Sequence, residues 1–473
     1  MLGQGGNMKS TNKNFLYNLF YQLFSFIIPL ITIPYVSRRL GANSIGIYSY
    51  TYSIINYFML TSMLGINNYG SREIAKSSSD LAKKSKTFFS IYYLQLICTG
   101  LMVLLFIVFL NMYNYEYKLI LLIQGIYLIS CALDINWYFF GVEKFKITIS
   151  RNIIIKILSL LFIFVLVKGK EDLWIYTLIL SASTLISQLY LWIYMKDEIR
   201  LVPVRFSDII SHLKNCILLF VPVVAYSIYR ITDKTMIGVL SNTIQLGNYE
   251  SAEKVINIPL SVISALGSVM LPHMSKTEDA QFAKKIEETF KLCFFILFPI
   301  FIGLMIISED FSNVFFGRDF IYTANIIRFL IITILFSGVT NIIRNNYLIP
   351  KSKDKIYVKS TVYGATINLV LNLMFIRKYG AYGACIGTVC AELTVMLYQV
   401  LMTKKEIDYI YNLRKVSPFL IKSLIMGVII ILINHIGFHN DTIKVILQIT
   451  IGGLVYLGLN QKYILYEFIG IKN

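Results

Sequence analysis

The chain has 473 residues, of which 56% are hydrophobic and only 15% are charged, and it carries a net charge of +18. An ordinary soluble domain has about 25% charged residues, so this composition excludes a water-soluble fold. The basic residues are spread over many short segments and never form one face, which excludes nucleic acid as a partner. We therefore expect the chain to lie in a membrane.

Apolar stretches follow one another along the whole chain, with the charges gathered between them. Because about 20 helical residues cross a hydrocarbon core of about 30 Å, we predict an all-α polytopic membrane protein with about 14 transmembrane helices. The predicted spans are 15–36, 45–64, 88–110, 119–140, 147–167, 173–194, 216–237, 251–271, 292–307, 321–343, 358–376, 383–402, 418–436 and 443–459.

The first span, 15–36, is too long for the apolar core of a cleavable signal peptide, so we expect it to be retained. Residues 1–14 are predicted to form a cytoplasmic tail, with 1–7 an upstream start or cloning remnant. With the amino terminus inside, about two thirds of the lysines and arginines fall on the inner side. Both termini are therefore predicted to be cytoplasmic, with the positive charge facing anionic lipid headgroups.

Motifs of catalysis and metal binding are missing from the sequence. It contains no HExxH, Walker or GxSxG pattern, and its six cysteines lie in or beside apolar spans without a CxxC pair. We predict that the protein is not an enzyme and holds no metal or cofactor. Transport then has to draw on a gradient, such as that of H⁺ or Na⁺, on the membrane potential, or on the substrate gradient.

A polar joint at 196–215 predicts two lobes. We expect an N-terminal lobe at 15–214, with about six helices and the linker, and a C-terminal lobe at 215–473, with about eight helices, the last two peripheral. A weak internal sequence similarity indicates a parallel repeat of the two halves, with chance as the alternative. The residues that recur at equal spacing are Gly46, Tyr48, Ile55 and Asn56 in the first copy and Gly247, Tyr249, Ile256 and Asn257 in the second.

Several short motifs occur in a fixed order along the chain. They are Pro34-Tyr35, Ser37-Arg38-Arg39-Leu40-Gly41, Gly46-Ile47-Tyr48, Tyr69-Gly70-Ser71-Arg72-Glu73-Ile74-Ala75, Asn136-Trp137-Tyr138-Phe139-Phe140-Gly141, Asp233-Lys234-Thr235-Met236-Ile237-Gly238 and Gly380-Ala381-Tyr382-Gly383. In these motifs the chain resembles polysaccharide transporters of the Wzx or O-antigen flippase type. That family is similar to multidrug and toxic-compound extruders and to the lipid II flippase.

The resemblance implies two pseudo-repeated helical lobes in a V around a central cavity. It also implies that the protein moves undecaprenyl-diphosphate-linked oligosaccharide from the inner to the outer leaflet of the bacterial cytoplasmic membrane by alternating access. The product would serve capsule, exopolysaccharide or O-antigen assembly, with membrane lipids, a polysaccharide polymerase and chain-length proteins as partners. The alternatives are a multidrug cation antiporter, a lipid II-type flippase, or a membrane enzyme, which the short outer loops disfavour.

For such a substrate the protein has to supply cations to the diphosphate and amide, hydroxyl or aromatic groups to the sugars. Arg230, midway along the seventh span, is the first candidate, because a charge at the bilayer centre costs about 3 kcal/mol and cannot face lipid. Asp233 and Lys234 share its helix face, which predicts an anion-binding wall. A self-contained pair of Arg230 and Asp233 is the alternative.

Arginines near span ends are further candidates for phosphate binding: Arg38 and Arg39 at the outer mouth, Arg72 at the inner mouth, and Arg328 in the tenth span. Arginines there also reach the headgroups without any binding role. Asn68 and Tyr69 are candidates for sugar binding, with helix capping as the alternative for the asparagine.

Three more charges fall inside predicted spans. Glu392 is the candidate for coupling to an ion, and a hydrogen bond to Asn368 or Asn372 is the competing explanation. Asp134 and Lys156 lie at similar depth in consecutive spans, and we predict that they form a structural pair.

Overall fold

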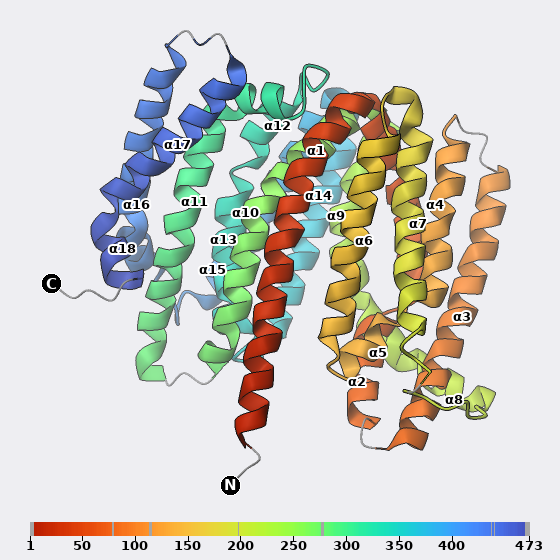
Figure 1. Ribbon diagram of the computed structural model, residues 1–473. Coiled ribbons are helices and arrows are strands. Elements are labelled where there is room, and N and C mark those ends of the chain that lie inside the picture. The colour runs from red at the N-terminus through yellow and green to blue at the C-terminus, as the bar shows by residue number, and fades with distance from the viewer. Residues whose placement is uncertain are drawn as a thin grey trace. The chain divides into compact units, whose positions relative to one another are not determined.

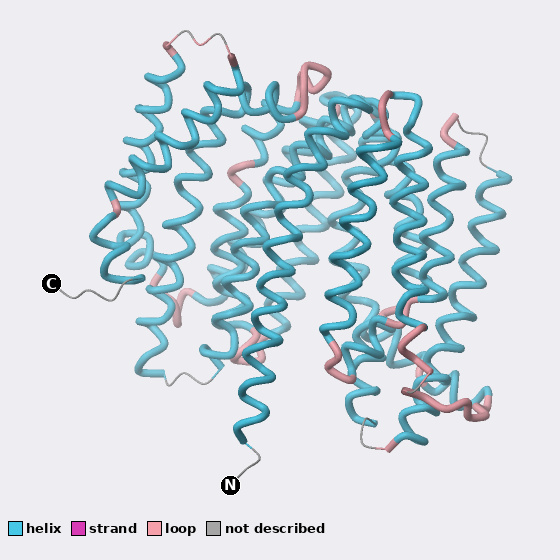
Figure 2. Tube along the Cα trace, viewed as in Figure 1, coloured by secondary structure: helices cyan, strands magenta, loops and turns pink. Residues whose placement is uncertain are grey.

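The structure is a computed structural model that describes residues 4–77, 80–112, 116–196, 198–275, 279–436, 438 and 440–468. Within these ranges it does not describe the side chains of 4–27, 221–223, 225, 226, 228–230, 268, 269, 271–273, 275, 279, 280, 466 and 468. The described residues form helices joined by short connections and contain no strand (Figure 2). The prediction of an all-α protein is confirmed.

Nine helical segments among the described residues are long and apolar enough to cross a membrane. They are Leu81–Met112, Lys118–Gly141, Phe145–Leu166, Lys170–Trp192, Gln281–Phe315, Thr323–Leu348, Ala381–Thr403, Tyr409–Asn434 and Asp441–Leu459. The remaining predicted spans fall on α1 (Gln4–Met63), α9 (Leu213–Leu240), α10 (Thr243–Ser275) and α14 (Asp354–Tyr379). The last three helices are each about 40 Å or longer at 1.5 Å per residue, enough to cross a bilayer.

Helix surfaces agree with a lipid environment. On α3 (Leu81–Met112), the side chains of Ile97, Leu101, Leu104 and Leu105 are exposed by about half or more. A helix that exposes a face of leucine and isoleucine is stable only where the solvent is also apolar. The chain is therefore a multi-pass membrane protein.

The chain divides into two compact units, residues 1–231 and 232–473, which meet inside α9. The lobe boundary predicted from the polar linker, between 214 and 215, lies at the start of that helix. Besides α1, α3 and most of α9, unit 1 contains α2 (Ile66–Ser77), α4 (Lys118–Leu133), α5 (Asn136–Gly141), α6 (Phe145–Leu166), η1 (Lys170–Asp172), α7 (Leu173–Trp192) and α8 (Phe206–Ser211).

Unit 2 contains the end of α9, α10 and α14, together with eight further elements (Figure 1). These are α11 (Asp279–Phe315), α12 (Thr323–Leu330), α13 (Thr333–Ile343), the π-helical turn η2 (Arg344–Leu348), α15 (Ala381–Thr403), α16 (Tyr409–Asn434), α17 (Asp441–Leu459) and α18 (Gln461–Phe468). The last two long helices pack on α11: Lys444 of α17 forms an ion pair with Asp310 at 2.9 Å, and the Tyr456 hydroxyl donates to the Phe295 carbonyl oxygen.

A glycine divides α1, the long red helix of Figure 1, into the first two predicted spans. Gly41 has φ 75° and ψ 171°, a backbone conformation that strains any residue with a Cβ atom. By the spacing of the internal sequence similarity, Gly41 corresponds to Asn242, which lies in the turn between α9 and α10. The same connection is thus a kink in one unit and a turn in the other.

Helix pairing repeats in the two units. In unit 1, α3 packs on α4, α4 on α7, and α6 on α7, whereas in unit 2, α11 packs on α12, α12 on α15, and α14 on α15. The pairs occur in the same chain order. This agreement supports the predicted parallel repeat, with α16 and α17 as an addition to the second copy.

Candidate functional site

Arg39 fastens the kinked region of α1 to the connection between α6 and α7. Its guanidinium lies 5.5 Å from the centre of the Tyr35 ring and donates from Nη1 to the carbonyl oxygen of Lys168 at 3.4 Å. The Tyr35 hydroxyl donates to the carbonyl oxygen of Val167 at 2.7 Å. Arg38 is exposed beside it. Arg39 therefore has a structural contact, while both guanidinium groups stay accessible to an anion.

On α2 the three predicted residues have different environments. Asn68 is exposed, and Arg72 is 52% exposed with Nε 3.4 Å from Glu73 Oε1. Tyr69 is buried, and its hydroxyl is 2.7 Å from Nδ1 of His212 in the linker before α9. The Tyr69 hydroxyl is thus engaged inside unit 1, whereas Asn68 and Arg72 are open to a ligand.

The motif around Tyr69 explains how α2 packs on α5. A Cβ atom on Gly70 would lie 2.6 Å from Cε3 of Trp137, and one on Gly141 would lie 2.7 Å from the carbonyl oxygen of Ser71. Trp137 is fully buried and donates from Nε1 to Gln95 Oε1 at 3.0 Å. Two of the motifs that carry the family resemblance therefore form one helix interface.

The linker between α7 and α9 is held against unit 1. Glu198 forms ion pairs with Lys84 and Lys144 and accepts a hydrogen bond from the Tyr138 hydroxyl. Burial alone raises the pKa of Glu198, but the hydrogen bonds and charges of these partners outweigh burial and lower it. Asp208, 3.0 Å from Lys86, provides another anchor. None of these pairs was predicted, because their partners are far apart in sequence.

Arg328 lies on α12 near the start of its span. It donates from Nη1 to Asn325 Oδ1 at 3.0 Å, and Nη2 is 3.4 Å from Glu309 Oε2 of α11. The side chain is 36% exposed. Arg328 therefore has two partners, Asn325 on its own helix and Glu309 on α11.

Asp233 is the centre of a buried polar cluster in unit 2. Its carboxylate accepts hydrogen bonds from Tyr249 of α10 at 3.0 Å, Thr388 of α15 at 2.8 Å and Asn372 of α14 at 2.5 Å. Asn372 also donates to Asn368 at 3.1 Å. We call these five residues the Asp233 cluster. The side chain of Arg230, the first predicted cation, lies outside the described residues.

Asp233 and the three groups that donate to it lie at the same depth. Each lies six or seven residues from the end of its helix, which is about 10 Å at 1.5 Å per residue. A carboxylate at this depth needs donors from the protein, because lipid offers none.

Lys234 has different partners from those that the sequence indicated. Its Nζ is 2.7 Å from Glu250 and 2.9 Å from Glu253, both on α10. Lys254 approaches Glu250 at 3.5 Å. The two charges inside the predicted eighth span are therefore both paired, Glu253 with Lys234 and Lys254 with Glu250.

Glu392 of α15 accepts a hydrogen bond from the hydroxyl of Ser337 on α13 at 2.8 Å. The competing explanation named Asn368 or Asn372 as its donor. Asn372 instead donates to Asp233 and Asn368, so that explanation was wrong for Asn372. Glu392 is half-buried and lies one helical turn along α15 from Thr388 of the Asp233 cluster.

The predicted pairing of Asp134 with Lys156 is corrected. Asp134 lies where the helix is broken between α4 and α5, and its carboxylate accepts from the backbone N–H and the side-chain amide of Asn136. The cation that acts on it is Arg151, which is 3% exposed and donates to Asn136 Oδ1 at 2.9 Å. Arg151, which lies near the start of α6, therefore takes the role predicted for Lys156.

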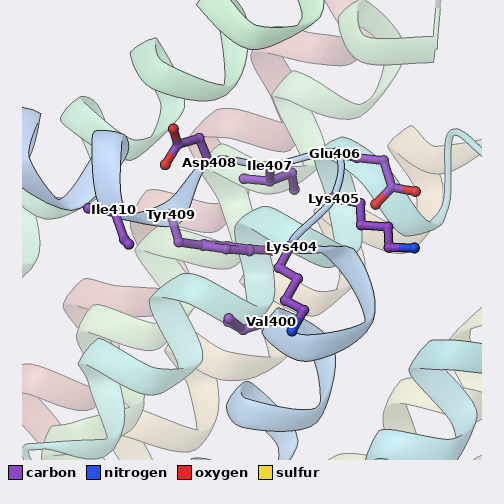
Figure 3. A pocket seen from close by; sticks show the side chains of 8 residues that line it. All are labelled: Val400, Lys404, Lys405, Glu406, Ile407, Asp408, Tyr409 and Ile410. Atoms are coloured by element: carbon purple, nitrogen blue, oxygen red, sulfur yellow. The ribbon is translucent and has the colours of Figure 1, made fainter.

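A pocket of about 510 Å³ lies where α15 is followed by α16. Lys404, Lys405, Glu406 and Asp408 are among its lining residues (Figure 3). Glu406 is paired with Lys353 at 3.2 Å, and Asp408 caps α16 by accepting from the Tyr411 N–H. None of the residues predicted as a site lines this pocket.

Two helical units of one kind, with carboxylates and amides held inside the membrane spans, define a polytopic membrane carrier. The chain belongs to the family described as polysaccharide biosynthesis protein, which it matches over residues 11–278. It is 23% identical over 402 residues to a protein named putative O-antigen transporter from Shigella dysenteriae, an alignment that covers 83% of this chain and 100% of that protein.

Two further proteins are similar to the chain. One, named probable low-salt glycan biosynthesis flippase Agl15, from Haloferax volcanii, is 24% identical over 241 residues, half of each chain. The other is a solved structure described as lipid II flippase MurJ in an inward closed conformation, with a TM-score of 0.75 and 19% identity over 95% of this chain and 99% of that one. This likeness confirms the fold predicted from the sequence.

Proposed function

We propose that the protein is a flippase that carries polyprenyl-diphosphate-linked oligosaccharide from the inner to the outer leaflet of the cytoplasmic membrane for surface polysaccharide assembly. The observation that carries the proposal is the family match together with an alignment over the full length of a protein named as an O-antigen transporter. The polar groups inside the spans of unit 2 support it, because a passage for sugars has to offer hydrogen bonds where lipid offers none.

The proposal includes an orientation with both termini in the cytoplasm and alternating access as the mechanism. The excess of lysine and arginine on the side of the amino terminus supports this orientation. We also propose that the protein acts without catalysis and delivers its substrate to a polymerase and chain-length proteins. Its relatives carry the names of transporters and flippases, which supports this part of the proposal.

Phosphate recognition is proposed for the exposed arginines. Arg38, Arg39 and Arg72 are accessible in unit 1, and Arg328 is partly accessible in unit 2. A guanidinium meets phosphate oxygens with two parallel hydrogen bonds and stays charged at every physiological pH. Arg230 remains a candidate by its position in the sequence.

The energy source is proposed to be a gradient of H⁺ or Na⁺ that acts on Asp233 or Glu392. Among the described side chains, the hydrogen-bond donors of Asp233 are the neutral groups of Tyr249, Thr388 and Asn372. A carboxylate bonded by neutral groups keeps a charge that a proton or a small cation can balance.

The proposal is tested with the full chain in proteoliposomes that contain an undecaprenyl-diphosphate oligosaccharide. A glycosidase added outside releases sugar only from substrate in the outer leaflet, so flipping is measured as the fraction that becomes cleavable with time. We expect cleavage to pass one half only when the protein is present. Equal cleavage in empty vesicles contradicts the proposal.

A lipid II-type flippase is the second candidate, supported by the TM-score of 0.75 to the MurJ structure. The same assay with lipid II in place of the oligosaccharide lipid distinguishes the two. Faster flipping of lipid II would favour the second candidate, and export of an organic cation without either lipid would favour a multidrug antiporter.

A further inference from the structure

The exposed side of α13 and η2 is polar, although the segment Thr323–Leu348 is an apolar span by length and composition. The buried side of these elements is mainly apolar and includes Ile334, Ile342 and Ile343. The side chains that are at least partly exposed are Leu335, Phe336, Ser337, Thr340, Asn341, Arg344 and Asn345. The polar residues among them recur at intervals of three and four, so they form one stripe along the helix.

This pattern is the reverse of a lipid-facing helix. On α3 from Ile97 to Val108, the exposed residues are leucine, isoleucine, valine and glycine, as lipid requires. An amide or hydroxyl turned to hydrocarbon costs several kcal/mol, and a guanidinium costs more. The stripe therefore faces water or a polar ligand.

The neighbouring helix α10 continues the polar surface. It contacts α13, and its partly exposed residues include Asn257 and Ser261, with Ser264 exposed. Gly267 of α10 lies against the stripe, because a Cβ atom there would be 2.4 Å from Asn341 Oδ1 and even closer to Asn345 Nδ2. Two adjacent helices thus present hydroxyl and amide groups on one side of unit 2.

Asn341 and Asn345 offer an unused donor and an unused acceptor. Their described hydrogen bond joins Asn345 Nδ2 to Asn341 Oδ1 at 2.9 Å. That bond leaves the Asn341 amide N–H groups and the Asn345 carbonyl oxygen for a ligand. A donor and an acceptor side by side fit two neighbouring hydroxyl groups, each of which donates and accepts.

The ends of the stripe carry different chemistry. At one end Ser337 donates to Glu392, and at the other the guanidinium of Arg344 lies 4.5 Å from the centre of the Tyr357 ring on α14. Arg344 begins a π-helical turn, a feature that is frequent at functional sites. Asn346 of the same turn is buried, and neither polar atom of its side-chain amide is bonded to a described partner. A buried amide without hydrogen bonds costs free energy, which a purely structural segment would avoid.

We propose that Ser337, Asn341, Arg344 and Asn345, with the polar side of α10, form a binding subsite for the sugar residues of the lipid-linked oligosaccharide. The inference rests on the proposed function and adds the place where its carbohydrate is held. Neutral donors and acceptors dominate the stripe, which fits sugar hydroxyls better than a diphosphate. Arg344 and its aromatic partner fit a sugar ring or an acidic substituent on it.

The test compares two substrates in the proteoliposome assay: undecaprenyl diphosphate with the complete oligosaccharide and the same lipid with a single sugar. The variant is Asn341→Ala combined with Asn345→Ala. We expect the apparent KM for the oligosaccharide lipid to rise by about tenfold, from two lost hydrogen bonds, and that for the single-sugar lipid by less than about twofold. The matched control is Thr366→Ala, since Thr366 is exposed on α14 and donates only to the Val362 carbonyl oxygen of its own helix.

The outcomes separate the two proposals. If the wild-type protein flips neither lipid, the proposed function is wrong, and the sugar-binding subsite, which depends on it, is wrong as well. If the wild-type protein flips both and the double variant behaves like Thr366→Ala, the subsite is overturned while the function stands. An equal loss for both lipids also overturns it, because the residues would then serve the diphosphate or the fold.

A second measurement applies even if the double variant does not fold. Asn341→Cys and Thr366→Cys are labelled with a charged, water-soluble thiol reagent and compared with the wild-type protein, which has six cysteines. We expect the reagent to label Asn341→Cys, and the oligosaccharide lipid to slow this labelling at least threefold. Thr366→Cys should be labelled no more than the wild-type protein. Absence of labelling at position 341, or labelling that the substrate leaves unchanged, overturns the subsite.

Discussion

The Tyr69 hydroxyl of α2 is 2.7 Å from Nδ1 of His212, a residue of the linker that leads into α9. His212 is half-buried, and its burial lowers the pKa of the imidazole below the usual 6.5, against the opposing charges of Glu73 and Asp208. The contact joins one of the family-like motifs to the segment that connects the two units.

This contact predicts a loss of stability in acid. Because the folded protein binds a proton at His212 less readily than the unfolded chain, stability falls as the pH drops below about 6.5 through the lower folded pKa. His212→Gln keeps an acceptor for Tyr69 and removes the titration. We expect the melting temperature of the wild-type protein in detergent to fall more between pH 7 and pH 5 than that of His212→Gln. Parallel curves for the two proteins would show that His212 does not contribute.

Packing between α2 and α5 predicts that Gly70→Ala is harmful. The added methyl group would lie 2.6 Å from Cε3 of the fully buried Trp137, and the overpacking should cost about 1–3 kcal/mol. Gly100→Ala is the control, since a Cβ atom there has nothing within 4 Å. We expect less folded protein and a lower melting temperature for Gly70→Ala, and no loss for Gly100→Ala. Equal stability of the two variants would mean that the α2–α5 interface adapts.

The corrected partner of Asp134 gives a further prediction. Arg151→Gln removes the cation that acts on the half-buried Asp134 carboxylate, together with the donor to Asn136, and should destabilise the protein by about 1–3 kcal/mol. Lys156→Gln should have a clearly smaller effect. Thermal unfolding of both variants, and of each combined with Asp134→Asn, checks this, and the second substitution should relieve part of the Arg151→Gln loss. A larger effect of Lys156→Gln would restore the pairing predicted from the sequence.

Helix positions could be predicted because the length of an apolar run is set by the bilayer and is independent of tertiary contacts. The kink at Gly41, for example, falls between the two predicted spans 15–36 and 45–64. The partners of charged residues could not be predicted in this way. Equal depth in regular helices predicts a pair of Asp134 and Lys156, but the helix is broken between α4 and α5, and the cation that acts on Asp134 is Arg151.

The same reasoning explains the other differences in unit 2. The sequence offers Asn372 as a candidate donor to Glu392 because their spans are consecutive, yet in the structure Asn372 donates to Asp233 of α9. Arg344 was missed because the predicted span ended at residue 343, so the arginine counted as part of a loop. The helix continues through a π turn instead, and a polar stripe emerges only when the exposure of each side chain is known.

Ion coupling can be tested at Glu392 and at its hydrogen-bond donor Ser337. Glu392→Gln removes the ionisable group but keeps an acceptor for the Ser337 hydroxyl, whereas Ser337→Ala removes the hydrogen bond and keeps the charge. If Glu392 exchanges the coupling ion, Glu392→Gln flips at a rate that no longer responds to an imposed pH or Na⁺ gradient. Ser337→Ala should retain that response, with a rate lowered by about tenfold or less, since one hydrogen bond contributes about 1 kcal/mol. A gradient response that survives in Glu392→Gln and disappears in Asp233→Asn would assign the coupling to the Asp233 cluster.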